Sequence, residues 1–337
     1  MNKHTVLLSI ACFSLLSVSA NAAENNFNTC VTEKALNGAE TLTLKQIREQ
    51  CTQAIETKNV EVKPKSNDGL VTKRLEEERS TQFSSWVITP HRPNYVLPVI
   101  TSSGINKEAY RTLDGYEDNL EDNEAKFQLS LKVPLNTGDM LVEGDGLYVG
   151  FTLQAWWQIY ASGISKPFRE TNYQPELFYL APTSWQPFGG NTAVMLGIEH
   201  QSNGRAQDLS RSWNRVYANF IYEKNDFALS FRPWYRLSED EKEFEFDPNG
   251  DDNPDIKDYM GNFELGMVYK YNDLEFGFLG RQNFSTSRGA AELSLSFPLY
   301  GKLRVYATAF NGYGESLIDY NHHQTRVGVG ISLNNVL

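Results

Sequence analysis

The chain is poor in basic residues and in long apolar runs, and each shortage excludes a class of protein. Its 337 residues include 31 Lys and Arg against 42 Asp and Glu, a formal net charge of −11. A protein that binds nucleic acid is usually basic, so we expect no such partner. Beyond the N-terminal leader, no apolar run approaches the ~18 residues of a membrane-spanning helix. The low mean hydropathy, −0.46, is still typical of a membrane β-barrel, whose strands need only one apolar face.

The first 22 residues have the pattern of a secretory signal peptide. Lys3 and His4 precede a short apolar stretch, and Ala20-Asn21-Ala22 supplies the small residues at a cleavage site. The apolar stretch is too short to serve as a helical membrane anchor. We therefore predict that residues 1–22 direct export and are removed after Ala22.

Cysteine is also scarce, and one of the three cysteines lies in the leader. The other two, Cys30 and Cys51, enter an oxidising compartment after export, which favours a disulfide between them. Apolar residues recur at helical spacing from Leu44 to Ile55. We predict that residues 23–85 form a small helical extension closed by that bridge, followed by a charged linker or exposed helix. The alternative is a loosely ordered tail with two unrelated thiols.

Residues 86–337 read as a transmembrane β-barrel. Aromatic residues are abundant (19 Phe, 17 Tyr and 6 Trp), and many lie near the ends of strand-like segments, where outer-membrane barrels carry aromatic girdles. Since lipid offers no hydrogen bonds to the backbone, strands cross it only as a closed ring. A soluble secreted β-sandwich or barrel is the alternative. Twelve segments with period-two alternation are predicted as antiparallel strands: 94–103, 125–135, 146–161, 171–181, 191–202, 210–222, 228–236, 259–271, 274–283, 289–298, 302–313 and 324–337.

Polar residues interrupt the apolar face of two neighbouring predicted strands. By alternation, His200 and Ser202 continue the face that begins at Val194, and Asn214 continues an apolar row on the next strand. If the two strands form a hairpin centred at Gln207, the numbers of each pair of opposed residues add to 414. His200 then lies opposite Asn214, and Ser202 lies opposite Ser212. Opposed side chains are about 5 Å apart at Cβ, within reach of a hydrogen bond.

These residue types suit nucleophilic catalysis at a lipid surface. Ser202 is a nucleophile once a base removes its proton, His200 is that base, and Asn214 holds the imidazole tautomer. An amide is less costly than a carboxylate beside hydrocarbon, and the accessible substrate is a lipid ester. The alternative is an interfacial histidine with only local hydrogen bonds, because a His-x-Ser sequence also arises by chance.

The connection after Ser202 offers oxygen ligands for calcium. Asp208, Ser210 and backbone carbonyls lie between residues 203 and 211, and Ca²⁺ prefers such donors. The backbone N–H of Gly204 is a candidate oxyanion donor. A second acidic cluster at 247–255 resembles part of a calcium-binding loop in composition only, and an ordinary solvated loop is the alternative.

The segments 197–205 (GIEHQSNGR) and 210–215 (SRSWNR) resemble outer-membrane phospholipase A, as do 126–131 (KFQLSL), 167–173 (PFRETNY), 251–256 (DDNPDI) and 312–321 (GYGESLIDYN). The resemblance covers about residues 94–337. It implies a twelve-stranded barrel in the bacterial outer membrane, with both termini periplasmic and the catalytic residues Ser202, His200 and Asn214 facing lipid. It implies Ca²⁺-dependent hydrolysis of acyl esters of glycerophospholipids and lysophospholipids, activated by homodimerisation.

The same resemblance implies a set of calcium ligands. These are the Arg205 carbonyl and Ser210 from one chain, Ser165 from a partner, and Asp252 at a second, monomer-type site. Two positions depart from the family. Gln207 stands where a second carboxylate of the monomer-type site is expected, and Leu153 stands where a glutamine can lie in the dimer interface.

Two alternatives to a phospholipase remain at this point. The first is a channel or structural barrel without hydrolase activity, although candidate inward residues such as Glu199, Arg215 and Arg232 would fill the lumen. The second is a hydrolase for another amphiphile, such as the acyl chains of lipid A.

Overall fold

The structure, a computed structural model, describes residues 32, 34, 43, 45–47, 50, 51, 69–81, 84, 87–244, 247 and 250–334. The predicted leader, residues 1–22, lies outside the described residues. The chain divides into two units, residues 1–65 and 66–337. In the first unit, Cys51 is buried and disulfide-bonded. Its predicted partner, Cys30, is outside the described residues, so that pairing stays a prediction.

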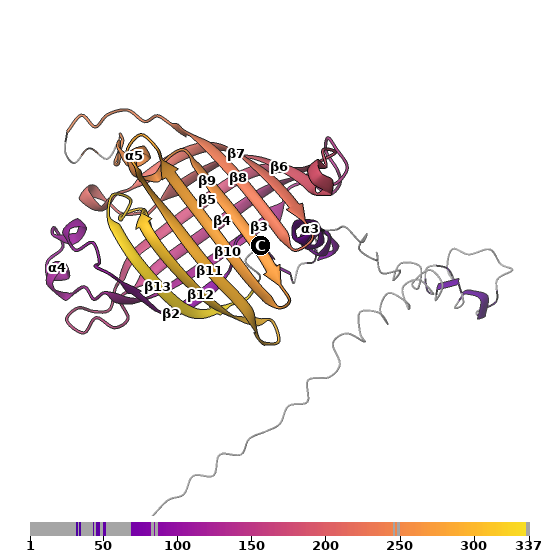
Figure 1. The fold of residues 1–337 in the computed structure, drawn as a ribbon, viewed down its shortest axis with the longest axis horizontal. Helices are drawn as coiled ribbons and strands as arrows, with labels where there is room; N and C mark the ends of the chain where they lie inside the picture. The colour runs from indigo at the N-terminus through magenta and orange to yellow at the C-terminus, as the bar shows by residue number, and fades with distance from the viewer. Residues whose placement is uncertain are drawn as a thin grey trace, which may run out of the picture. The chain divides into compact units, whose positions relative to one another are not determined.

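The second unit contains the predicted barrel, a closed ring of twelve antiparallel strands (Figure 1). Each strand pairs with its neighbours in sequence, and β13 pairs with β2 to close the ring. A further two-residue strand, β1 (Thr89–Pro90), pairs with β3 beyond the start of β2. The ring consists of β2 (Tyr95–Ser102), β3 (Asn123–Pro134), β4 (Gly146–Trp157), β5 (Phe168–Thr183), β6 (Asn191–Ser202), β7 (Ser212–Lys224), β8 (Phe227–Leu237), β9 (Phe263–Tyr271), β10 (Leu274–Asn283), β11 (Arg288–Tyr300), β12 (Leu303–Tyr313) and β13 (His323–Ser332).

Alternation along the strands gives the barrel an apolar outside and a polar inside. On β6, Leu196 and Ile198 are 52% and 54% exposed, whereas Glu199 is 4% exposed. Glu199 lies opposite Arg215 in the β6–β7 ladder, and Arg215 also pairs with it as an ion pair. Because each strand of the ring is hydrogen-bonded to a strand on both of its sides, the ring has no open edge, which is the requirement for crossing lipid.

Exposed aromatic side chains gather toward both ends of the barrel. A set at one end comprises Tyr160, Phe168, Tyr235 and Phe284, and a set at the other comprises Trp185, Phe188, Tyr271 and Tyr300. Aromatic rings at these two levels are the girdles that flank the apolar band of a membrane barrel.

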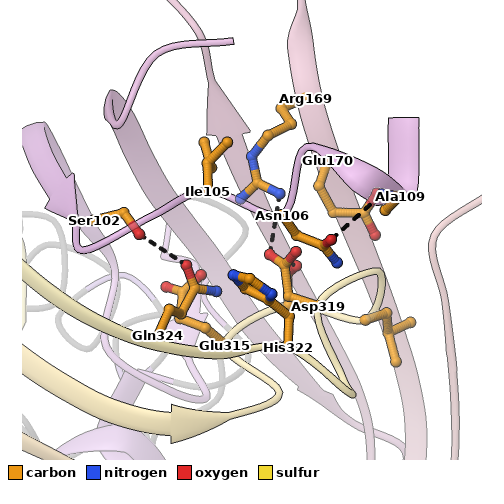
Figure 2. A network of polar contacts seen from close by, with 12 residues as sticks. Ser102, Ile105, Asn106, Ala109, Arg169, Glu170, Glu315, Asp319, His322 and Gln324 are labelled. Atoms are coloured by element: carbon orange, nitrogen blue, oxygen red, sulfur yellow. Dashed lines mark hydrogen bonds and ion pairs between the residues drawn. The ribbon is translucent and has the colours of Figure 1, made fainter. Parts of the chain in front are cut away.

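Ion pairs fill the interior of the barrel. Glu124 accepts hydrogen bonds from Arg169 at 3.0 Å and from Arg326 at 2.6 Å, and all three side chains are fully buried. Figure 2 shows Arg169 reaching Asp319, 3.0 Å away, from the strand wall. Such charges are retained in a low-dielectric interior only when they are paired. The predicted filled interior, which makes a poor pore, is therefore confirmed.

Helix α3 (Leu70–Thr81) is bound to one rim of the barrel. The Glu223 carboxylate, near the end of β7, accepts the backbone N–H groups of Val71 and Thr72, a favourable position for an anion at a helix N-terminus. At the other end of α3, Glu78 pairs with Lys132 at 2.7 Å. The sequence pattern predicts a linker or exposed helix here. A helix without buried residues is present, and these contacts join it to the barrel unit.

The two ends of the barrel differ in the length of their connections. Tight turns at 225–226, 272–273 and 301–302 lie at the α3 end, where β2 begins and β13 ends. The α3 end also has the β3–β4 connection, 135–145. The two longest connections, 103–122 and 238–262, lie at the opposite end, and this end carries the short helices η1 (Glu108–Tyr110), α4 (Tyr116–Asn119), η3 (Gln207–Leu209) and α5 (Ile256–Met260). The turn helix η2 (Pro187–Gly189) is at the α3 end. Of the helices the structure describes, none combines the length and apolar character needed to cross a membrane.

Candidate active site

The register of the β6–β7 hairpin is the predicted one. His200 lies opposite Asn214 and Ser202 lies opposite Ser212. The His200 Nδ1 atom is 2.9 Å from the Asn214 Oδ1 atom, a hydrogen-bond distance. Both side chains are half-buried and share the outward face with exposed Ile198 and Val216. A histidine and an asparagine thus meet on the lipid-facing wall, where strand alternation alone calls for apolar residues.

Ser202 is the last residue of β6, two positions beyond His200 on the same face. It lies opposite Tyr173 of β5 as well as Ser212 of β7. Gly204 follows with a positive φ of 63°, and a Cβ atom there would lie 3.3 Å from the Tyr173 ring. A glycine is therefore favoured at this position both by backbone conformation and by the closeness of Tyr173.

Asn203 organises the loop that follows Ser202, and sequence reasoning missed it. Its buried side chain accepts the N–H groups of Arg205 (3.2 Å) and Arg211 (3.0 Å) and donates to the Leu209 carbonyl (2.7 Å). One amide therefore holds both ends of the 203–211 loop. The pattern Asn-Gly after a strand signals a turn, but not an amide that spans eight residues.

Two of the four predicted calcium ligands touch each other. The Ser210 hydroxyl donates to one oxygen of Asp252 at 2.5 Å, and the Lys242 ammonium lies 2.5 Å from the other oxygen. Arg205 is on the same loop as Ser210, and its guanidinium donates to the carbonyls of Phe168 and Arg169. Ser165 is exposed on the neighbouring β4–β5 connection.

The donors around Ser210 suit calcium, but the surroundings of Asp252 suit it less well. Hydroxyl, carbonyl and carboxylate oxygens are hard donors of the kind that Ca²⁺ binds. Gln207, where a second carboxylate is expected, is exposed. Within the described ranges there is no group of three or more His, Cys, Asp or Glu side chains that could hold a metal. The oxygen set that fits a calcium ion is therefore Ser210 with backbone carbonyls.

A further carboxylate contacts the predicted catalytic set. The Asn214 side-chain amide donates from Nδ2 to Glu239 Oε1 at 2.9 Å. The sequence pattern ends the preceding strand at 236, whereas β8 continues to Leu237, which lies opposite Asn214. Alternate residues of a strand lie on one face, so residue 239 lies on the same face as Leu237. Continuing the predicted strand beyond 236 would have identified Glu239 as a neighbour of Asn214.

An outward-facing serine and a hydrogen-bonded histidine, two residues apart on the wall of a closed barrel, are the residue types of an ester hydrolase that acts at a membrane. Residues 71–333 match the model of the phospholipase A1 family. The chain belongs to that family. The predicted ester hydrolase is thereby confirmed over a channel or a structural barrel without activity.

Relatives and solved structures agree with this assignment. The phospholipases A1 of Escherichia coli K12 and Klebsiella pneumoniae are each 40% identical, over 80% of this chain and 88% of their own lengths. The structure of outer membrane phospholipase A from E. coli is 39% identical, with a TM-score of 0.71 over 78% of this chain and 98% of that one. A Salmonella typhi outer membrane phospholipase, a dimer with bound calcium, is 37% identical with the same TM-score and coverage. The predicted outer-membrane location agrees with these relatives and with the closed barrel.

Proposed function

We propose that this protein hydrolyses acyl esters of glycerophospholipids and lysophospholipids in the outer membrane, with Ser202 as nucleophile, His200 as base and Asn214 as the residue that orients His200. The observation that carries the proposal is the 2.9 Å contact of His200 with Asn214 on the lipid-facing wall, two residues from Ser202. Apolar residues cover this wall, so the accessible ester belongs to a lipid.

The chemistry follows from the positions of these groups. Ser202 Oγ attacks the ester carbonyl carbon while His200 Nε2 takes its proton, and Asn214 Oδ1 accepts the N–H of Nδ1. The backbone N–H of Gly204 donates to the oxyanion. His200 then protonates the departing alkoxide, which leaves as a lysophospholipid or a glycerophosphodiester. Water, deprotonated by His200, releases the fatty acid from Ser202.

A calcium ion and a second copy of the chain complete the proposed site. The Arg205 carbonyl and the Ser210 hydroxyl would hold the ion, together with the partner subunit's Ser165. When bound, Ca²⁺ polarises the substrate carbonyl or a water at the oxyanion position. The exposed setting of Ser165 and the calcium-bound Salmonella typhi dimer support this arrangement. Asp252 would serve a separate monomer-type site.

We further propose that the barrel end with tight turns faces the periplasm. The α3 end contains the start of β2 and the end of β13, so both termini of the barrel unit leave from it. Short periplasmic turns and longer extracellular loops are the usual asymmetry of outer-membrane barrels. The site would then lie at the outer leaflet.

The test is fatty-acid release from phospholipid–detergent micelles by wild type, Ser202→Ala and His200→Ala, each with Ca²⁺ or with EDTA. We expect wild type to release fatty acid with Ca²⁺ and not with EDTA. With Ca²⁺, the rate of release by each variant should be lower by at least about 10³-fold. Heat-modifiable gel mobility checks that each barrel is folded. Equal release by folded Ser202→Ala would refute the assigned nucleophile. The same assay with lipid A in place of phospholipid tests the alternative substrate. Release of fatty acid from lipid A and not from phospholipid would favour that alternative.

A further inference from the structure

We propose that Glu239 is a positioning residue for the esterase, acting through Asn214 to fix the hydrogen-bonding direction of the catalytic amide and so the tautomer of His200. This inference rests on the proposed function of Ser202 and His200. The observation behind it is a chain of two contacts of equal length. His200 Nδ1 is 2.9 Å from Asn214 Oδ1, and Asn214 Nδ2 is 2.9 Å from Glu239 Oε1.

A carboxylate on one side of an amide determines what the amide presents on the other side. A carboxylate only accepts hydrogen bonds, so Asn214 must turn its NH₂ group toward Glu239. The carbonyl oxygen of Asn214 then faces His200, and an oxygen can only accept. His200 must therefore carry its proton on Nδ1, which leaves Nε2 free to take the proton of Ser202.

Without Glu239, nothing in this chain of contacts opposes a flipped amide. If Asn214 rotates by half a turn, its NH₂ group faces His200 Nδ1, which must then accept a hydrogen bond. The imidazole proton moves to Nε2 in that state, and His200 cannot act as a base. An aspartate in the place of Asn214 would always accept from His200 Nδ1, because a carboxylate has no donor. Asn214 has a donor and an acceptor, and Glu239 determines which of them faces His200.

The position of Glu239 follows from the strand and from a braced loop. Leu237 is the β8 partner of Asn214, and Glu239 lies two residues further along, on the same side by alternation. The next residue, Asp240, accepts the N–H of Asp251 at 2.8 Å through its carbonyl. Asp251 in turn accepts a hydrogen bond from the buried Arg236 at 2.6 Å. Both sides of Glu239 are therefore tied to the end of the barrel.

This placement also reconciles a carboxylate with a lipid-facing site. An ionised group directly beside His200 would lie against hydrocarbon, which is costly. Glu239 lies beyond the last residue of β8, where the wall gives way to the polar loops. The uncharged amide spans the distance between the two environments.

The test compares two substitutions of similar size that differ in their ability to accept a hydrogen bond. Glu239→Gln keeps a carbonyl oxygen for Asn214, and Glu239→Met removes it. We expect Glu239→Met to lower kcat about 10-fold with KM within about 2-fold of wild type. Glu239→Gln should fall between Glu239→Met and wild type, because the new amide accepts from Asn214 in one orientation but donates to a flipped Asn214 in the other. Labelling of Ser202 by a sulfonyl fluoride should slow in parallel. Glu241→Met, an exposed carboxylate on the same loop, is the matched control and should match wild type.

A double-mutant cycle separates positioning from a general structural role. In an Asn214→Ala background, Glu239→Met should cause no further loss, because the residue through which it acts is gone. An equal loss in both backgrounds, or wild-type kcat in folded Glu239→Met, would overturn the inference. If instead Ser202→Ala keeps its activity, the proposed function fails and not the role of Glu239 alone. Should Glu239→Met fail to fold, slowed labelling of a folded Glu239→Gln variant supports the inference, and wild-type labelling of that variant contradicts it.

Discussion

The Lys242 ammonium lies 2.5 Å from a carboxylate oxygen of Asp252, whose other oxygen accepts the Ser210 hydroxyl. The Lys242 ammonium therefore occupies an oxygen of Asp252, the residue that we propose as a ligand of a monomer-type calcium site. With Gln207 where a second carboxylate is expected, the proposed monomer-type site has one carboxylate, and that carboxylate is paired with an ammonium. Asp252 and Ser210 also touch, so the state of Asp252 bears on the proposed calcium ligand Ser210.

Lys242→Met should lower the calcium concentration needed for half-maximal activity. Removal of the ammonium frees a carboxylate oxygen and removes a like charge near the proposed ion. We expect a shift of about 3-fold or more in a calcium titration of fatty-acid release, since even about 0.7 kcal/mol is a factor of three. Lys257→Met, an exposed lysine on α5, is the control. An unchanged titration would mean that Lys242 and calcium do not compete.

Ser210→Ala should act in the opposite direction and raise the calcium requirement. The hydroxyl is one of few oxygen donors in the proposed site, and the alanine keeps the β7 end intact. The activity at saturating calcium should approach that of wild type if the ion still binds. A calcium titration that superimposes on that of wild type contradicts the assignment of Ser210 as a ligand.

Glu124→Ala should destabilise the barrel by about 3 kcal/mol, because it leaves the buried guanidinium groups of Arg169 and Arg326 short of a partner. Glu108, whose ion pair with Arg111 is exposed, provides the contrast. Its replacement by alanine should cost less than about 1 kcal/mol. Denaturant unfolding in detergent micelles, followed by tryptophan fluorescence, measures both. Equal costs would show that the interior charges do not stabilise the ring.

The β3–β4 connection should lose stability in acid through Asp145. Loss of hydration would raise the pKa of Asp145 above its ordinary value of 3.8, but the Tyr179 hydroxyl and the N–H groups of Met140, Leu141 and Val142 bring it well below that value. A lowered pKa in the folded state means that the stabilisation is complete above the unfolded pKa, near 4, and is lost as the pH falls through the folded pKa.

Asp145→Asn tests this dependence. Its melting temperature should lie below that of wild type at pH 7, with a gap that narrows below about pH 4. Melting curves of both proteins from pH 7 to pH 3 make the comparison. A gap of constant size across this range would contradict the expected role of the ionised carboxylate.

Local pattern was sufficient for the ring and for the β6–β7 register. The alternation over 191–202, flanked by turn residues, predicts a strand with the bounds that β6 has. In an antiparallel hairpin, one residue pair determines the whole register. Choosing the register of the hairpin was therefore enough to predict that His200 lies opposite Asn214. Other strand ends were off by a few residues, as at β5, which runs to Thr183 and not 181.

Contacts between distant segments could not be predicted in this way. Glu239 belongs to an acidic run with Asp240, Glu241 and Glu243, and nothing in the run distinguishes one carboxylate from the next. Likewise, the charges of residues 70–81 suggest a solvated helix, whereas Glu223, about 150 positions further along, binds the start of α3. Such pairings depend on the closed ring, which brings together residues that have no periodic relation.

His200, Asn214 and Ser202 share an outward face, so this enzyme would meet its substrate by diffusion within the plane of the membrane and not by diffusion through solution. A pocket in a soluble protein collects ligand from a volume, but a site on the wall of a barrel collects it from a sheet. Encounter would depend on how many lipid molecules occupy each unit of membrane area, and on their lateral diffusion. Turnover would therefore respond to the composition of the leaflet around the barrel, whatever the total amount of lipid in the sample.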